Sequence, residues 1–200
     1  MVNVTLDMNC IIDLANGKGA ATHVERLIKN HEDGKIKLRV VAISASEKKP
    51  DGTYASNFSE FRNRVAAIGL GQAEILKPLC YLGITYYNWC LAADEKTGPM
   101  ENLERKIHEI LFPQIQFSYR EFCKKNRIDV KSRPIHPGWR NPKCDVLSLW
   151  SHIYYGSGIF VTMDNNFHMP MKKRSLISLG AGEILRPEDS VMQVTQSKTP

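Results

Sequence analysis

The sequence predicts an α/β protein of three layers, α/β/α, in which helices cover both faces of a central, mostly parallel sheet. Short apolar runs of strand length alternate with stretches in which apolar residues recur every three or four positions, as in amphipathic helices. Two of these runs are followed directly by an acid, Asp7 and Asp164. Because parallel strands end at one edge of a sheet, we expect both acids at that edge, where α/β proteins bind ligands.

The chain length favours one compact domain. Its 200 residues, 42% of them apolar, can bury a substantial core. We expect this domain over residues 1–192, with a helical elaboration or insertion at about 73–135 and a flexible polar tail at 193–200. No internal repeat divides the chain further.

The first elements follow from hydrophobic periodicity and from the residues that begin and end helices. Asn57 and Glu60 have the spacing of a capping box and begin a helix that runs to about residue 68. The elements expected in this half are strands at 2–6, 36–43 and 74–79 and helices at 10–15, 20–32 and 57–68.

The second half contains further helices before the alternation resumes. Asn141 and Pro142 form a favourable N-cap and first-turn pair for a helix over 143–155, which places Asp145 in its first turn. Gly156 and Gly158 then end this helix. The elements expected here are helices at 101–111, 117–126 and 143–155 and strands at 159–163 and 183–185.

Composition restricts the protein's location and partners. Twenty-seven basic residues against 21 acidic ones give a net charge of +6, which favours affinity for polyanions. Five cysteines form no C-x-x-C pair, as in a reduced intracellular chain, so we expect a cytoplasmic protein. No stretch approaches 18 apolar residues, and we expect no membrane contact.

Four acids have the placement of ligands for a hard cation. Asp7 and Asp164 follow strands, Glu47 follows a third strand closely, and Asp145 begins a helix that would overlie the same edge. Mg²⁺ and Mn²⁺ prefer oxygen ligands held on rigid elements. These acids therefore predict a metal site, although each one alone also fits a structural role. Asp after a strand commonly caps a helix, Asp145 would favour the positive end of a helix dipole, and Glu47 fits a solvated loop.

Four segments, in order, resemble the PIN-domain family of ribonucleases. They are "VTLDMNCIIDL", "VVAISASE", "CDVLSLWSHIYYGSGIFVTMDNNF" and "GEILRPED". The resemblance covers about residues 1–70 and 140–190. It departs from the family at Asn166, where many members place another Asp, and in the basic, proline-containing loop after Glu47.

This resemblance implies a PIN-like fold and Mg²⁺- or Mn²⁺-dependent hydrolysis of RNA phosphodiester bonds. Asp7, Asp145 and Asp164 would be the metal ligands, with Glu47 as a fourth catalytic acid. Asn9, Thr162 and Asn166 would hold ligands or waters by hydrogen bonds. For Asn9 and Thr162, ordinary turn bonding explains the sequence equally well. With Asn166 in place of an acid, the number of metal ions, one or two, stays open.

The expected partners are RNA and, because compact PIN domains often act as toxins, an antitoxin protein. Lys172, Lys173 and Arg174 would meet the phosphate backbone beside Asp164, with a solvated basic face as the alternative. Trp139 and Arg140, which precede Asp145, would stack on a base or guide the RNA strand, or equally pack their loop against the core. The aromatic residues between 81 and 89 are typical of a core or a homodimer interface.

Two other functions fit parts of the sequence. A PIN-fold protein that binds or scaffolds RNA without cleaving it would also explain Asn166. A phosphohydrolase of the haloacid dehalogenase type likewise begins with a strand and an Asp, but it uses Asp-x-Asp where this chain has Asp7-Met8-Asn9. It would therefore lack its general acid, and the nuclease remains the leading hypothesis.

Overall fold

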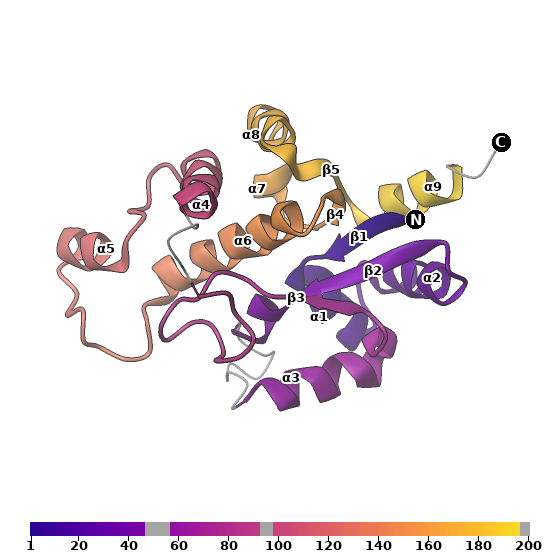
Figure 1. Cartoon of the computed structure of the whole chain (residues 1–200), viewed down its shortest axis with the longest axis horizontal. Coiled ribbons are helices and arrows are strands. Elements are labelled where there is room, and N and C mark those ends of the chain that lie inside the picture. Colours follow the sequence, from indigo (N-terminus) through magenta and orange to yellow (C-terminus); the bar gives the residue numbers. More distant parts are fainter. Residues whose placement is uncertain (47–56, 93–97, 197–200) are drawn as a thin grey trace.

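The computed structural model describes residues 1–46, 57–92 and 98–196. Its centre is a five-stranded, all-parallel sheet, flanked by helices on both faces (Figure 1). The three-layer α/β/α class predicted from the sequence is confirmed. The strands are β1 (Val2–Leu6), β2 (Ile36–Val41), β3 (Glu74–Leu76), β4 (Gly158–Val161) and β5 (Gly182–Leu185).

The strand order, β3-β2-β1-β4-β5, reverses beside β1. Val4 is the register partner of Leu38 in β2 on one side and of Ile159 in β4 on the other. The chain thus adds β2 and β3 on one side of β1 and then crosses back to add β4 and β5 on the other side. In such open sheets, ligands bind outside the carboxyl ends of the strands at this reversal point.

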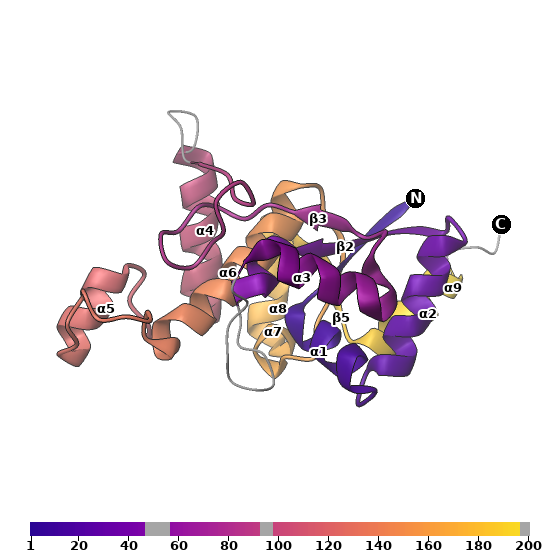
Figure 2. The ribbon, with the colours of Figure 1, turned by 90° about the horizontal axis from the view of Figure 1, so that it is seen from below.

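The helices form two layers with separate cores (Figures 1 and 2). One layer contains α1 (Met8–Asn16), α2 (Ala21–Glu32), α3 (Phe58–Val65) and α9 (Pro187–Gln196). The opposite layer contains α4 (Gly98–Leu111), α6 (Pro137–Tyr154), α7 (Asn165–His168) and α8 (Pro170–Leu176). A further helix, α5 (Tyr119–Asn126), lies beyond the start of α6, and short helical turns occupy η1 (Ala42–Ser46), η2 (Ala66–Leu70) and η3 (Ile177–Ala181).

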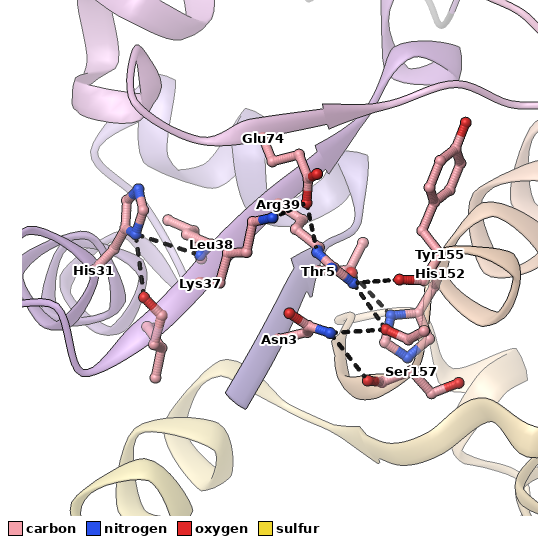
Figure 3. A network of polar contacts seen from close by, with 12 residues as sticks. Asn3, Thr5, His31, Lys37, Leu38, Arg39, Glu74, His152, Tyr155 and Ser157 are labelled. Carbon is pink, nitrogen blue, oxygen red and sulfur yellow. Dashed lines mark hydrogen bonds and ion pairs between the residues drawn. The ribbon is translucent and has the colours of Figure 1, made fainter. Parts of the chain in front are cut away.

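A polar network lies where the sheet packs against the carboxyl end of α6 (Figure 3). Arg39 donates from Nε to Glu74 Oε2 at 2.8 Å and from one terminal nitrogen to the carbonyl oxygens of Tyr155 and Gly156. Asn3 donates to the Gly156 carbonyl at 2.9 Å. Strand side chains therefore fix the turn that leads from α6 into β4.

His152 joins the same network from α6 (Figure 3). It is fully buried, accepts from Thr5 Oγ1 at 2.8 Å through Nδ1 and donates from Nε2 to the Ala181 carbonyl at 2.9 Å. Burial lowers the pKa of His152 to about 4. The imidazole is therefore neutral at physiological pH and serves as a structural linker.

Several predicted boundaries are wrong. Helix α6 begins at Pro137, not at 143, because His136 Nδ1 accepts from Gly138 N at 3.1 Å and caps the helix earlier. Asp145 thus lies in its third turn rather than its first. Helix α9 includes residues 193–196 of the predicted tail, since Val191 and Val194 pack into the core. Strand β2 ends at Val41, where a 3-10 turn begins.

The helical elaboration expected at 73–135 contains α4 and α5, but it begins with β3, which belongs to the central sheet. The helix expected at 57–68 begins as predicted, because Asn57 accepts from Glu60 N at 3.0 Å. Among the described residues, no helix has both the length and the apolar character needed to cross a membrane.

Candidate functional site

Asp7 and Asp164 follow the two strands at which the sheet order reverses. Asp7 comes directly after β1 and caps α1, accepting from Met8 N at 2.9 Å. Asp164 lies three residues beyond β4 and caps α7, accepting from Asn166 N at 2.9 Å. Because β1 and β4 are neighbouring parallel strands, the two acids lie at adjacent strand ends on the carboxyl edge of the sheet.

One hydroxyl group joins the two acids. Thr162 Oγ1 donates to Asp7 Oδ2 at 2.7 Å and accepts from Asp164 N at 3.1 Å. Asn9 completes the cluster, because its Nδ2 donates to Asp7 Oδ2 at 2.7 Å while its Oδ1 accepts from Met163 N at 3.0 Å. The hydrogen bonds expected of Asn9 and Thr162 are therefore present, and we call these four residues the acid cluster.

The acid cluster places a carboxyl group in a buried position. Asp7 is only 3% exposed, and burial is the main cause that raises its pKa, opposed by hydrogen bonds from Thr162 and Met8. The negative charge of Asp164 raises the pKa of Asp7 further. Within residues 1–46, 57–92 and 98–196, neither acid forms an ion pair. A cation bound here would favour the ionised form of both carboxylates.

The other two predicted acids are placed differently. Glu47 lies outside the described residues. Asp145 is half-buried on α6. Among the residues that the structure describes, no three Asp, Glu, His or Cys side chains form a group that could hold one metal ion, so Asp7, Asp145 and Asp164 do not form one.

Two of the four predicted RNA-binding residues, Arg140 and Lys172, have hydrogen-bond partners within the protein. Arg140 is 7% exposed and donates to the Ser46 carbonyl at 2.6 Å, as the alternative of a packed loop would have it, and its contact with RNA stays a prediction. Lys172 is half-buried, donating to the Leu111 carbonyl at 2.8 Å and to Asn166 Oδ1 at 2.5 Å. Lys173 is half-buried, and Arg174 is exposed.

The Asn166 amide group has its hydrogen-bond partners in Leu111 and Lys172 rather than in the acids. Its Nδ2 donates to the Leu111 carbonyl at 3.3 Å, and only its backbone N–H contacts Asp164. The side-chain role expected for Asn166 beside the metal ligands is not seen. The amide instead joins α7 to the end of α4.

Two residues near the acid cluster were not predicted. His168 Nε2 donates to the Thr162 carbonyl at 2.9 Å. Arg186, directly after β5, donates to Asn165 Oδ1 at 2.6 Å and thus places a cation at the same edge of the sheet. The sequence signal that could have indicated Arg186 was its position immediately after the predicted strand "GEIL".

Comparisons with known proteins do not assign the chain to a family. No family model matches it, and neither a curated protein nor a solved structure shows significant similarity to it.

Proposed function

We propose that this protein is a PIN-like, metal-dependent endoribonuclease that hydrolyses RNA phosphodiester bonds at the acid cluster. The observation that carries the proposal is the position of Asp7 and Asp164 at the reversal point of a parallel sheet, joined by Thr162. A buried acid whose pKa is raised partly by a second acid is typical of a functional site.

The side chains present fit a hard cation. Mg²⁺ commonly uses one or two protein carboxylates and completes its coordination with water and substrate phosphate. Asp7 and Asp164 supply two carboxylates, and Asp145 and Glu47 are the additional acids proposed on grounds of sequence. A bound Mg²⁺ or Mn²⁺ would lower the pKa of a water molecule and polarise the phosphate.

The chain's own residues would orient these ligands. Asp7 accepts three hydrogen bonds, from Met8 N, Asn9 Nδ2 and Thr162 Oγ1, which fix the plane of its carboxylate. A carboxylate has about four acceptor positions, so one remains for a cation. Arg186, at the neighbouring strand end, is suitably charged to attract the phosphate of the substrate.

RNA cleavage in Mg²⁺ or Mn²⁺ tests the proposal. We expect Asp7→Asn and Asp164→Asn each to abolish cleavage, whereas Glu25→Gln, an exposed acid on α2, leaves the rate unchanged. Cleavage that survives in both Asp variants would overturn the assignment. A rate lost equally in the Glu25 variant would mean that general negative charge, rather than the acid cluster, is responsible.

A second candidate function is RNA binding without cleavage. Two observations favour it: Asp7 is only 3% exposed, and the Asn166 side chain forms hydrogen bonds with Leu111 and Lys172. In that case the unmodified chain would bind RNA and leave it intact at every Mg²⁺ or Mn²⁺ concentration, and Asp7→Asn would not weaken RNA binding.

The resemblance to PIN domains also leads us to propose an antitoxin partner. Expression of the chain alone should then arrest growth, and Asp7→Asn should relieve the arrest. Unimpaired growth, together with RNA cleavage in vitro, would separate the nuclease from a toxin role.

A further inference from the structure

The segment 113–137 carries most of the chain's excess positive charge. It surrounds α5 and lies at the amino-terminal end of α6, away from the sheet (Figures 1 and 2). Its acids are Glu121 and Asp129. Its basic residues, all exposed, are Arg120, Lys124, Lys125, Arg127, Lys131 and Arg133. Six cations less two anions give +4, out of +6 for the whole chain. We call this segment the basic lobe.

The cations of the basic lobe are available to a ligand. In the part of the chain that the structure describes, none of the six forms an ion pair. Lys125 donates to the Gln114 carbonyl at 3.4 Å, and Arg133 donates to the carbonyl of its neighbour Ser132 at 3.2 Å. A dense group of uncompensated cations favours a polyanion.

A cleft lined by aromatic and apolar side chains is formed by the basic lobe together with residues 80–82 and Trp139, which lie outside the lobe. Its volume is about 410 Å³, within the range of sites for small organic groups. Tyr81, Tyr119 and Trp139 line it, with ring centroids 5.2 Å apart for Tyr119 and Trp139 and 6.3 Å for Tyr81 and Trp139. Arg133, Leu82 and Val130 also line it, and Leu82 is 93% exposed.

A buried ion pair holds one wall of the cleft in place. Lys143 Nζ lies 2.7 Å from Glu104 Oε1, and both side chains are almost fully buried. The Tyr81 hydroxyl donates to Glu104 at 2.7 Å, and the Lys143 ammonium lies 4.7 Å from the Tyr81 ring centroid. Tyr81 is therefore oriented before any ligand binds, which reduces the entropic cost of binding.

We propose that the basic lobe binds single-stranded RNA, with bases against the aromatic cleft and phosphates on the surrounding cations. Single strands expose both base faces and phosphates, and this combination of a cationic surface with aromatic rings recognises them. A duplex hides its base faces, and an acidic protein would not require the aromatic wall. The proposal names the substrate class of the nuclease proposed above and rests on it in that respect.

Helix α6 connects this lobe to the predicted catalytic acids. Trp139 lines the cleft in the first turn of α6, and Asp145 lies six residues further along. Six residues of α-helix rise about 9 Å. A strand bound in the lobe would thus continue along α6 towards Asp145 and the carboxyl edge of the sheet.

Fluorescence anisotropy with a labelled RNA of about 12 nucleotides tests this site, in EDTA so that metal-dependent cleavage cannot occur. The lobe variant is Lys124→Gln, Lys131→Gln, Arg133→Gln, and the matched control is Lys18→Gln, Arg26→Gln, Lys29→Gln. All six positions are exposed. We expect the lobe variant to bind about 10- to 100-fold more weakly and to reduce the slope of log K against log salt by about 2, while the control changes little. Leu82→Ser should weaken binding severalfold without changing the salt slope.

The proposal would be overturned by full affinity in the lobe variant, by an equal loss in the control, or by competition from poly-glutamate as strong as that from unlabelled single-stranded RNA. Stronger binding of duplex RNA would also contradict it. Cleavage assays separate the two proposals. If the chain never cleaves RNA but its binding depends on the lobe, the nuclease proposal is wrong and the binding site stands. If the lobe variant cleaves RNA normally and binds it with full affinity, only the binding-site proposal is wrong.

Discussion

Two polar clusters on the same sheet differ in how their charges are compensated. The network beside the carboxyl end of α6 pairs the Arg39 guanidinium with Glu74 and two backbone carbonyls, and it contains a neutral His152 (Figure 3). The acid cluster places Asp7 near a second acid, and no described cation pairs with either one.

This difference distinguishes a polar cluster that stabilises the fold from one that is suited to bind a ligand. A buried charge persists at low cost when opposite charge and hydrogen bonds surround it, and such a network fixes the packing of α6 against β1 and β2. Like charges held together instead raise a pKa and favour an external cation. We therefore expect changes in the first cluster to affect stability and changes in the second to affect activity.

Asp7→Asn should show the largest difference between the effect on activity and the effect on stability. This change should lower RNA cleavage on the order of 10³-fold, because it removes a metal ligand. It should alter the free energy of unfolding by less than about 1 kcal/mol, since burial already disfavours the ionised carboxylate in the fold. Cleavage rates and urea denaturation measure the two quantities. A large loss of stability would show that Asp7 is mainly a structural cap.

His152 should make folding stability depend on pH. Its folded-state pKa of about 4 lies below the ordinary 6.5, so the unfolded chain binds the proton first as the pH falls. The contribution is complete above about pH 6.5 and is lost towards pH 4, a decrease of about 3 kcal/mol. Urea denaturation across this range should show the loss in the unmodified chain and in His23→Gln, but a flatter profile in His152→Gln. An equal slope in His152→Gln would assign the dependence to other groups.

Arg39→Met should destabilise the protein by about 2 kcal/mol, because it removes the side-chain donor of the Tyr155 carbonyl and leaves the Gly156 carbonyl with Asn3 as its side-chain donor. Lys37→Met is the matched control. Lys37 contacts the same Glu74 at 3.0 Å but is 44% exposed, and its loss should cost less than about 1 kcal/mol. Urea denaturation distinguishes the two, and equal losses would contradict a structural role specific to Arg39.

The smallest expected effect comes from Thr162→Val. The Thr162 hydroxyl lowers the pKa of Asp7, so its removal should raise that pKa and shift the acidic limb of the pH–rate profile to higher pH. Cleavage should fall about 10-fold, as for residues that orient metal ligands. Thr162→Ser should restore both the rate and the profile. A lower rate with an unshifted acidic limb would argue against a role through Asp7.

The sheet and one half of the acid cluster followed from local sequence patterns. Apolar runs predicted all five strands, and the acids that end two of them predicted Asp7 and Asp164 at one edge. The hydrogen bonds of Asn9 and Thr162 were expected from the resemblance to PIN domains, since Thr162 lies 155 positions from Asp7 and a local pattern does not join them.

The remaining features depend on contacts between distant segments. The Asn141-Pro142 pair predicted a helix start, but His136 and Pro137 use the same chemistry earlier, and the longer helix carries Asp145 into its third turn. Burial of Arg140 depends on its contact with Ser46, 94 positions away. The pairing of Asn166 with Leu111 and Lys172 likewise depends on how α4 packs beside α8.

Titration of the chain with Mn²⁺, followed by electron paramagnetic resonance, tests the central claim most directly. We predict that the unmodified protein binds Mn²⁺ and that Asp7→Asn combined with Asp164→Asn weakens binding at least about 10-fold, while Glu25→Gln binds as the unmodified chain does. Mn²⁺ binding with equal affinity in all three proteins would contradict a metal site at the acid cluster.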